Sequence, residues 1–308
     1  MKTRRKVELD DLTVQLATPH TPVAEAAGPL QIVARPQTVS ASHLPWLQVA
    51  MRSDVGQLRE DNQDSVFALT ALLPSPAGGV VPFGFFAVAD GMGGLAAGAA
   101  ASRLAIEMVA ARVTRDLLLP ALAGQGGQGS GRTVSDILSE ALAGAGKQIY
   151  AAARRAGSPS GTTFSGVLLL GRQLVTAHVG DSRIYLGGPA GLAPITEDHS
   201  VLARLVAMGQ LTAADVKDNP QRNVLYRSLG QADEVAVETA THPWRGASHL
   251  LLCSDGLWDL LDDSELTALL HDAADLDGAA DAMLAAANGR GGRDNISLIL
   301  VRLPADVA

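Results

Sequence analysis

The sequence predicts an α+β protein: an α-β-β-α sandwich in which two antiparallel sheets pack together and helices cover both outer sides. Two observations carry this prediction. Short apolar runs with β-branched and aromatic residues, typical of buried strands, alternate with alanine-rich stretches of helical spacing. Aspartates also stand at both the beginnings and the ends of these runs, which favours antiparallel pairing if the aspartates are to meet.

Six apolar runs predict the buried strands. They are PFGFFAVA (82–89), GTTFSGVLLL (161–170), QLVTAHV (173–179), SRIYL (182–186), HLLLCS (249–254) and NISLILVRL (295–303). Helical spacing, bounded by glycine, proline or a capping residue, predicts helices over residues 98–118, 133–155, 199–209, 263–271 and 277–288. The glycine-rich stretch 123–132 predicts a loop between the first two helices.

The first 45 residues differ from the rest of the chain. They hold five prolines and little apolar periodicity, which predicts a flexible, disordered leader over 1–45 and a folded domain over 46–308. The sequence shows no signal-peptide pattern and no apolar run of membrane-spanning length. We therefore expect a cytoplasmic protein, and the single cysteine, Cys253, is consistent with a reducing compartment.

The excess of acidic residues limits the kinds of molecule that the protein is expected to bind. With 32 acidic and 24 basic residues, the formal net charge is −8, which disfavours non-specific binding to nucleic acid. We expect a monomer that binds neither nucleic acid nor a membrane. A divalent cation would offset part of the negative charge.

Four aspartates mark the ends of predicted strands. Asp90 and Asp255 end the runs FFAVAD and LLLCSD. Asp294 precedes the last run, and Asp181 lies in the VGDSR turn between two runs. Antiparallel strands would bring all four to one edge, whereas a parallel sheet would place Asp294 at the opposite edge. Any one of these aspartates alone would more often be a simple turn residue, but the four together favour a shared site.

A cluster of carboxylates at a sheet edge would be destabilised by mutual repulsion unless a cation neutralises it. Ligands that are all oxygen select hard ions, so Mn²⁺ or Mg²⁺ is expected rather than zinc. Upstream, the segment SDVGQLREDNQDS holds Arg59, Asn62 and Asp64. The planar arginine fork matches phosphate oxygens, although for this segment taken alone a solvated charge cluster is the alternative.

Eight motifs follow one another over residues 46–303. They are SDVGQLREDNQDS, VADGMGG, GTTFSGVLL, AHVGDSRIYL, TEDHSVLARLVAMGQLT, RNVLYRSLG, LLCSDGLWDLLDD and GGRDNISLILVRL. In this order they resemble the metal-dependent serine/threonine protein phosphatases of type 2C, in particular the bacterial members. The resemblance implies the same sandwich with a dinuclear metal centre at one end. It also implies hydrolysis of phosphoserine and phosphothreonine in proteins by a metal-activated water, opposing a serine/threonine kinase.

The resemblance implies a role for each residue of the metal centre. Asp90 would bridge two metal ions, Mn²⁺ or Mg²⁺, and the carbonyl of Gly91 would bind one of them. Asp255 and Asp294 would complete the shell of the other ion. Asp64 would act mainly through a bound water.

Two further roles follow from the same resemblance. Asp181 would hold a third, weaker metal ion, and Arg59 would bind the substrate phosphate, so that Arg59, Asp64 and Asp90 are the residues expected to act in catalysis. The partners implied are phosphorylated protein substrates and a cognate kinase. Asn295 also matches a family position, as do Thr162 and Thr163, which we interpret as structural.

The sequence departs from the family pattern at four positions. Gln63 stands where many relatives have glutamate, so the second metal ion is expected to bind more weakly. Leu95 and Ala99 replace a histidine and a glutamate of bacterial relatives, which predicts altered packing or substrate contact. Met92 replaces a histidine that in some eukaryotic relatives could protonate the leaving group. A thioether cannot donate a proton.

Four alternatives stay open from the sequence. The same fold could serve as a phospho-binding scaffold with weak catalysis, or as a phosphatase of small phosphorylated metabolites. Cys253 could resemble a thiol nucleophile, but no CxxxxxR loop follows it, and a core position is favoured. His199 could contact the substrate or the third metal ion, with capping and packing as the alternative.

Overall fold

The computed structural model describes residues 47–75, 79–124, 131–212, 215–216, 219, 221–244 and 246–304. The predicted leader over 1–45 lies outside the described residues, and so does Trp46, near which the folded domain is expected to begin. All elements named below belong to one structural unit, Ser42–Ala308.

The strands form two antiparallel sheets. The first sheet has the order β1-β11-β10-β7-β8, and the second has the order β2-β3-β5-β6-β9 with the short β4 paired to β3. Their bounds are β1 (Gln48–Asp54), β2 (Asp64–Pro74), β3 (Val80–Gly93), β4 (Ser160–Thr162), β5 (Phe164–Leu170), β6 (Gln173–Val179), β7 (Arg183–Gly188), β8 (Gly191–Pro194), β9 (Glu238–Pro243), β10 (His249–Cys253) and β11 (Ile296–Arg302).

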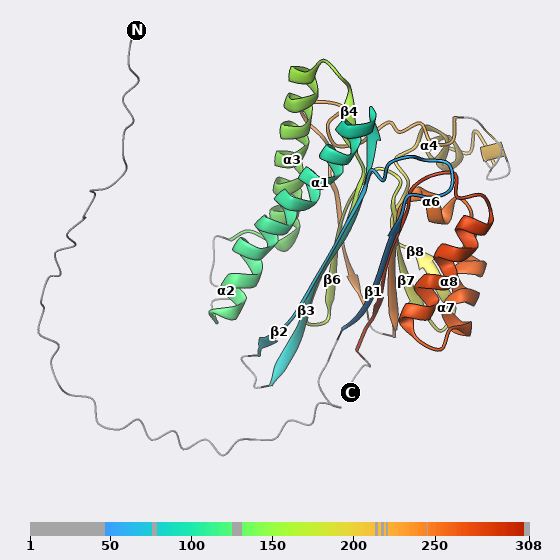
Figure 1. Cartoon of the computed structure of the whole chain (residues 1–308). Helices are drawn as coiled ribbons and strands as arrows, with labels where there is room; N and C mark the ends of the chain where they lie inside the picture. Colours follow the sequence, from blue (N-terminus) through green and yellow to red (C-terminus); the bar gives the residue numbers. More distant parts are fainter. Residues whose placement is uncertain are drawn as a thin grey trace, which may run out of the picture. The chain divides into compact units, whose positions relative to one another are not determined.

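The helices cover both outer faces of this pair of sheets. Their bounds are α1 (Leu95–Val113), the π-helical segment η2 (Thr114–Leu118), α2 (Leu119–Leu122), α3 (Val134–Ala156), α4 (Val201–Ala207), α6 (Asp255–Trp258), α7 (Asp263–Asp272) and α8 (Leu276–Gly289). Figure 1 shows α1 and α3 on one side and α7 and α8 on the other. In the described residues, no helix combines the length and the apolar character needed to cross a bilayer.

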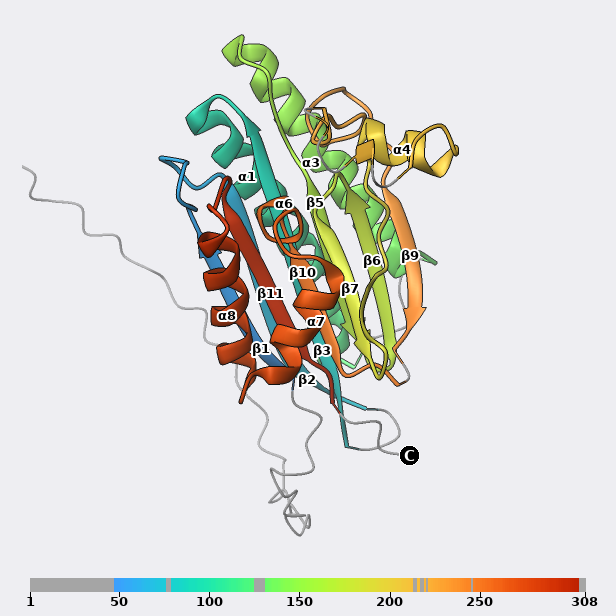
Figure 2. The same ribbon diagram turned by 90° about the vertical axis from the view of Figure 1, so that its right-hand side faces the viewer.

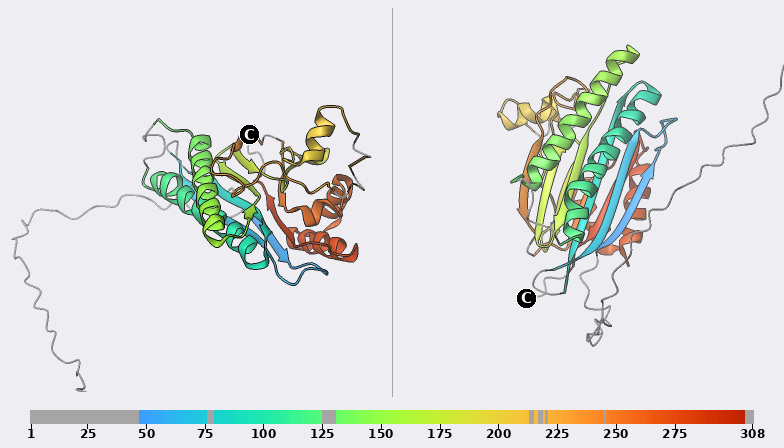
Figure 3. Two further views of the ribbon diagram at one scale, coloured as in Figure 1. Left: turned by 90° about the horizontal axis from the view of Figure 1, so that it is seen from above. Right: turned by 90° about the vertical axis from the view of Figure 1, so that its left-hand side faces the viewer.

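Figures 2 and 3 show the two outer layers face on. In Figure 2, α7 and α8 lie in front of the first sheet, with β11 between β1 and β10. In the right-hand view of Figure 3, α1 and α3 lie in front of the second sheet. The predicted α-β-β-α sandwich is therefore confirmed.

Alternation along the central strands builds three separate cores. In β3, Phe85 and Ala87 point into the core beneath α1 and α3, while Phe86 and Val88 point into the core between the two sheets. The third core lies beneath α7 and α8 and includes Leu298 of β11. Because successive side chains of a strand face opposite ways, a strand with a core on each side must be apolar at nearly every position.

The predicted helix over 98–118 is not one regular helix. It ends as α1 at Val113, passes through the π-helical segment η2 and resumes as the four-residue α2. Pro120 lies at the start of α2 and has no N–H with which to continue the α-helical pattern. A widened turn before a proline keeps the chain helical without the missing hydrogen bond.

Packing between the sheets is expected to control stability. Phe86 is completely buried there, so Phe86→Ala should lower the free energy of unfolding by about 3–5 kcal/mol, measured by urea denaturation. Leu170, at the end of β5, has 38% of its surface exposed, and Leu170→Ala should cost under about 1 kcal/mol. Equal losses in the two variants would contradict the assignment of the inter-sheet core.

Candidate metal centre

Strand pairing brings the first two aspartates together. In the antiparallel register of β2 with β3, Asp64 lies directly opposite Asp90. Asp90 does not end its strand, as the sequence predicted, because β3 continues to Gly93 by pairing with β4. The apolar run ends at residue 89, but hydrogen bonding to the polar β4 extends the strand beyond it. Apolar character therefore marks where the core stops and not where the strand stops.

Two threonines fix the backbone of Asp90. The N–H of Asp90 donates to Oγ1 of Thr163 at 2.9 Å, and its carbonyl accepts from Oγ1 of Thr162 at 2.8 Å and from the N–H of Thr163 at 2.9 Å. Both threonines are buried. These contacts are consistent with the structural interpretation of the threonines, and they hold the Asp90 backbone in one position.

Asp255 and Asp294 come from neighbouring strands. Asp255 is the first residue of α6, directly after β10, and Asp294 lies two residues before β11, which pairs with β10. A Cβ atom on Gly256 would lie 2.1 Å from the carbonyl oxygen of Asn295, so only glycine allows this close approach. The start of α6 is thereby pressed against the entry to β11.

The buried Asn295 ties the arginine-bearing loop to β11. Its Oδ1 accepts from the N–H of Gln63 at 2.8 Å, and its Nδ2 donates to the carbonyls of Val55 at 3.0 Å and Asp61 at 2.9 Å. Only 4% of the surface of Asn295 is exposed, so these three hydrogen bonds replace the contacts with water that its side chain would make in the unfolded chain. The loop that carries Arg59 is therefore fixed beside Asp294.

Asp181 lies in the turn between β6 and β7 and is 5% exposed. Its carbonyl accepts from Nε1 of Trp258 at 3.0 Å. The guanidinium of Arg183 stacks 3.6 Å from the Trp258 ring and makes two hydrogen bonds to Asp198, at 2.9 and 2.7 Å. The Asp181 turn is thus clamped by a tryptophan from α6, the helix that Asp255 begins.

Burial and mutual repulsion disfavour the charged carboxylates. Loss of hydration raises the pKa of Asp64 to about 7, aided by the charges of Asp255 and Asp294 and opposed by hydrogen bonds from Ser254 and Ser297. Burial, followed by the charge of Asp294, raises the pKa of Asp255 to about 6. Without a cation, these groups therefore hold their protons to a higher pH than exposed carboxyl groups do.

The pKa values of Asp90 and Asp181 are raised as well. Burial raises the pKa of Asp90 well above its usual range, and the charges of Asp64 and Asp255 add to this effect. Burial and the charge of Asp255 also raise the pKa of Asp181. Asp255 therefore interacts with both Asp90 and Asp181, so the structure brings these predicted site residues into one electrostatic group.

The side-chain contacts test whether a cation fits this group. Oδ1 of Asp64 and Oδ1 of Asp255 are buried and have no hydrogen-bond partner among the described residues. The other oxygen of each has one: Ser254 Oγ donates to Asp64 at 2.7 Å, and Asn223 Nδ2 donates to Asp255 at 3.3 Å. Unpartnered buried carboxylate oxygens, in a set of donors that are all oxygen, fit a hard divalent cation.

The carboxylates are near one another without forming a closed coordination shell. Over the described ranges, no three His, Cys, Asp or Glu side chains are grouped closely enough to hold an ion together. The charges of the neighbouring carboxylates act on Asp90 in the direction that raises its pKa, so these groups repel one another. One oxygen of Asp294 is already occupied, because the guanidinium of Arg59 donates to its Oδ2 at 2.6 Å.

Gly91 lies where helix α1 crosses the end of β3. Its N–H donates to the carbonyl of Gln63 at 3.1 Å, and a Cβ on Gly91 would lie 2.3 Å from the carbonyl oxygen of Gly98. A Cβ on Gly98 would in turn lie 2.8 Å from Oε1 of Gln63. The neutral Gln63 therefore packs against the glycines, and its carbonyl accepts a second hydrogen bond from Ser102 at 2.6 Å.

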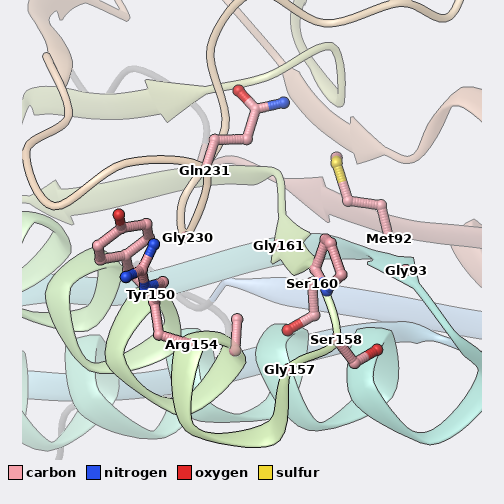
Figure 4. Close-up of a pocket in the computed structure, with 12 residues that line it drawn as sticks. Met92, Gly93, Tyr150, Arg154, Gly157, Ser158, Ser160, Gly161, Gly230 and Gln231 are labelled. Atoms are coloured by element: carbon pink, nitrogen blue, oxygen red, sulfur yellow. The ribbon is translucent and has the colours of Figure 1, made fainter.

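The remaining departures and candidates have clear positions. Ala99 lies on α1, and Met92 near the end of β3 lines a pocket (Figure 4). Leu95 begins α1, and its side chain lies outside the described part of the structure. His199 is 2% exposed and accepts from the N–H of Gly180 at 3.0 Å, which is consistent with the packing alternative.

Cys253 is completely buried in the core beneath α7 and α8, and burial raises the pKa of its thiol, so it has the features of an inert core residue. Sequence reasoning missed Ser254, Asn223 and Trp258, which contact the aspartates. Ser254 and Trp258 flank Asp255 in CSDGLW, so proximity in sequence was an available signal. Asn223 was not detectable, because it lies 32 residues from Asp255.

Two antiparallel sheets between helix layers, with buried aspartates meeting at strand ends, define a phosphatase of the metal-dependent type in its fold and donor set. The sequence model of the family described as Protein phosphatase 2C matches residues 62–297. The chain belongs to this family. The resemblance to bacterial type 2C phosphatases is thereby confirmed.

Curated relatives and solved structures agree with this assignment. The chain is 32% identical over 259 residues to the serine/threonine phosphatase stp of Listeria monocytogenes, covering 83% of this chain and 95% of that protein. It is 30% identical over 262 residues to the protein phosphatase PhpP of Streptococcus pneumoniae, covering 83% of this chain and 98% of that protein.

Among solved structures, the serine/threonine phosphatase PstP/Ppp of Mycobacterium tuberculosis superimposes with a TM-score of 0.69 at 31% identity, covering 84% of this chain and 99% of that one. A structure of the PstP catalytic domain in complex with 2 manganese ions superimposes with a TM-score of 0.65 at 28% identity, covering 84% of this chain and 98% of that one.

The raised carboxyl pKa values predict a specific pH dependence of stability in metal-free protein. The pKa of Asp64 is about 7 in the folded protein against an ordinary value of 3.8, so its contribution to stability is complete below about pH 4 and is lost as the pH rises to 7. Relative to Asp64→Asn, the chelator-treated wild type should lose stability across this window. Urea denaturation at a series of pH values measures this loss.

The matched control is Asp272→Asn, an exposed aspartate at the end of α7. Relative to this control, the wild type should show no comparable loss over the same pH range. A wild type that gains stability relative to Asp64→Asn between pH 4 and 7 would show that Asp64 is charged in the metal-free fold.

Proposed function

We propose that this protein is a metal-dependent phosphatase that hydrolyses phosphoserine and phosphothreonine in proteins and so opposes a serine/threonine kinase. The observation that carries the proposal is the group of aspartates at one end of the sheets, in which Asp64 and Asp255 each have a buried oxygen without a partner in the described residues, in a chain of the protein phosphatase 2C family. Curated relatives named serine/threonine phosphatase favour a protein substrate over a small metabolite.

The residues proposed to hold a pair of Mn²⁺ or Mg²⁺ ions are Asp64, Asp90, the carbonyl of Gly91, Asp255 and Asp294. A third, weaker ion is proposed at Asp181. When bound, such ions would supply an activated water and neutralise charge on the phosphate. The solved relative with 2 manganese ions supports the choice of metal. The leader over 1–45, the cytoplasmic location, the monomeric state and the cognate kinase stay predictions.

The residues around the carboxylates position them for this work. Ser254 holds one oxygen of Asp64 and leaves the other without a partner. Ser254 Oγ also accepts from the N–H of Ser297 at 3.0 Å, which connects Asp64 to β11. Because these partners are neutral, they orient the carboxylate without neutralising it, and its charge stays available to a cation.

Arg59 is proposed to bind the substrate phosphate. Its side chain is 53% exposed, and one of its nitrogens, Nη2, donates to Asp294. A guanidinium has five N–H donors in a planar fork, so the remaining donors can reach a phosphate while the contact with Asp294 persists. Asp294 would then both orient the arginine and hold a metal ion.

Loss of a proposed metal ligand should abolish activity. Asp255→Asn is expected to lower kcat/KM for a phosphothreonine peptide by at least about 100-fold, because an amide oxygen does not carry the charge that holds a divalent ion. It should also reduce the rise in thermal midpoint that Mn²⁺ causes in the wild type. The exposed Asp272→Asn serves as the control, with both properties retained. Full turnover by Asp255→Asn would contradict the proposed role of Asp255 as a metal ligand.

A direct comparison of substrates distinguishes a protein phosphatase from a phosphatase of small metabolites. Phosphothreonine peptides and a panel of phosphorylated metabolites are assayed with Mn²⁺ and with chelator. Metal-dependent turnover of the peptides is expected, with much slower turnover of the metabolites. Preference for a metabolite would favour the small-molecule phosphatase, and inactivity on every substrate would favour a phospho-binding scaffold.

Arg59→Gln should weaken phosphate binding without preventing metal binding. A charge-assisted hydrogen bond contributes about 1.5–3 kcal/mol, so kcat/KM should fall roughly tenfold or more. Arg59→Gln should still bind Mn²⁺, which is measured by the rise in thermal midpoint that the ion causes. If Arg59→Gln kept normal kcat/KM, the arginine would have only the structural contact with Asp294.

A further inference from the structure

A pocket of about 760 Å³ opens next to the proposed metal centre. Met92 and Gly93, at the end of β3, line one wall, and Tyr150 and Arg154, near the end of α3, line another (Figure 4). Met92 lies two residues beyond Asp90 on the same strand, a rise of about 7 Å. The pocket therefore begins within a short distance of the aspartate cluster.

Hydrogen bonds and close packing hold the floor of this pocket. The N–H of Thr162 donates to the carbonyl of Leu229 at 3.0 Å, and the N–H of Leu229 donates back to Thr162 at 2.9 Å. Gly230 follows with φ of 91°, and a Cβ there would lie 2.4 Å from a methyl group of Ile149. The same Thr162 bonds to the Asp90 carbonyl, so one residue connects the floor to the metal centre.

The lining of the pocket combines a larger apolar surface with several polar groups and carries one kind of charge. Arg154 is the charged residue among its described lining residues, which include no aspartate or glutamate. Tyr150, Ser158, Ser160 and Gln231 add polar groups (Figure 4). Arg154 and Tyr150 are four residues apart on α3 and so lie on the same helix face.

Arg154 is available to bind a ligand. It is exposed, and its guanidinium forms no ion pair or hydrogen bond with the described part of the chain. Several other arginines of the fold are occupied, as Arg183 is with Asp198 and Arg222 is with Asp259. An arginine without a partner in the described residues, at a pocket with no aspartate or glutamate in its lining, fits an anionic group of a ligand.

We propose that this pocket is a specificity subsite that binds an acidic side chain of the phosphoprotein substrate through Arg154. The inference rests on the proposed function, because the phosphorylated residue must lie at the metal centre. An extended peptide rises about 3.3 Å per residue, so a carboxylate roughly two to four residues from the phosphorylated residue reaches the pocket.

Charge complementarity selects an acidic occupant. The protein carries a net charge of −8, and the adjoining centre gathers several aspartates, so an acidic peptide would be repelled elsewhere on this surface. The unpaired guanidinium of Arg154 reverses this repulsion at one place. The subsite would therefore distinguish phosphoproteins by the residues that flank the phosphorylation site.

The test measures kcat/KM with Mn²⁺ for a series of phosphothreonine peptides. In each peptide a single glutamate occupies a different position beside the phosphothreonine, and a matching peptide with glutamine at that position is the control. The wild type should prefer glutamate at one or two positions by roughly three- to tenfold. Arg154→Gln should lose this preference through a higher KM, and Arg154→Lys should keep part of it.

Arg155→Gln is the matched control, since Arg155 is an exposed arginine of the same helix that does not line the pocket. It should keep the full preference for glutamate. Arg154→Glu should reverse the preference in favour of peptides with lysine at the same position. Circular dichroism establishes that all variants are folded.

Two results would overturn the subsite. One is equal kcat/KM for glutamate and glutamine peptides at every position in the wild type. The other is an equal loss of preference in Arg154→Gln and Arg155→Gln, which would indicate a general effect of surface charge. If the wild type hydrolysed p-nitrophenyl phosphate but no phosphopeptide, the proposed function itself would fail, and the subsite would fail with it.

Discussion

The desolvation of several carboxyl groups at one end of the sandwich is the constraint on which the rest of this structure depends. Burial and mutual repulsion raise the pKa values of Asp64, Asp90, Asp181 and Asp255, so in the metal-free fold burial opposes the negative charge that these groups would otherwise carry at neutral pH. Divalent cations remove this conflict, because they replace the protons and compensate the charge. The function proposed for the chain follows from that exchange.

The scaffold places the carboxylates through their backbones. Thr162 and Thr163 hydrogen-bond to Asp90, and the absence of a side chain on Gly256 lets the start of α6 approach Asn295. These contacts come from both sheets, so the centre can form only when the sheets have packed. A stable inter-sheet core is therefore a condition for the site. Rigid placement also explains how a pocket beside β3 keeps a fixed relation to the reacting phosphate.

The sequence predicted the interior of the fold better than its edges. All six predicted strands exist, because central strands have a core on each face and read as apolar runs. The missed strands β1, β2, β8 and β9 are edge strands, where partial exposure removes the apolar signal. The aspartates were found from turn chemistry and motif order, whereas Asn223 and the pairing of Arg59 with Asp294 depend on contacts distant in sequence.

The most direct test of the account is a crystal structure of the protein grown with Mn²⁺, with anomalous diffraction used to locate the ions. Two strong anomalous peaks are expected, bounded by Asp64, Asp90, the Gly91 carbonyl, Asp255 and Asp294, with the unpartnered oxygens of Asp64 and Asp255 in contact with metal. No peak among these residues at saturating Mn²⁺, with the oxygens of Asp64 and Asp255 still without a partner, would contradict the proposed metal centre.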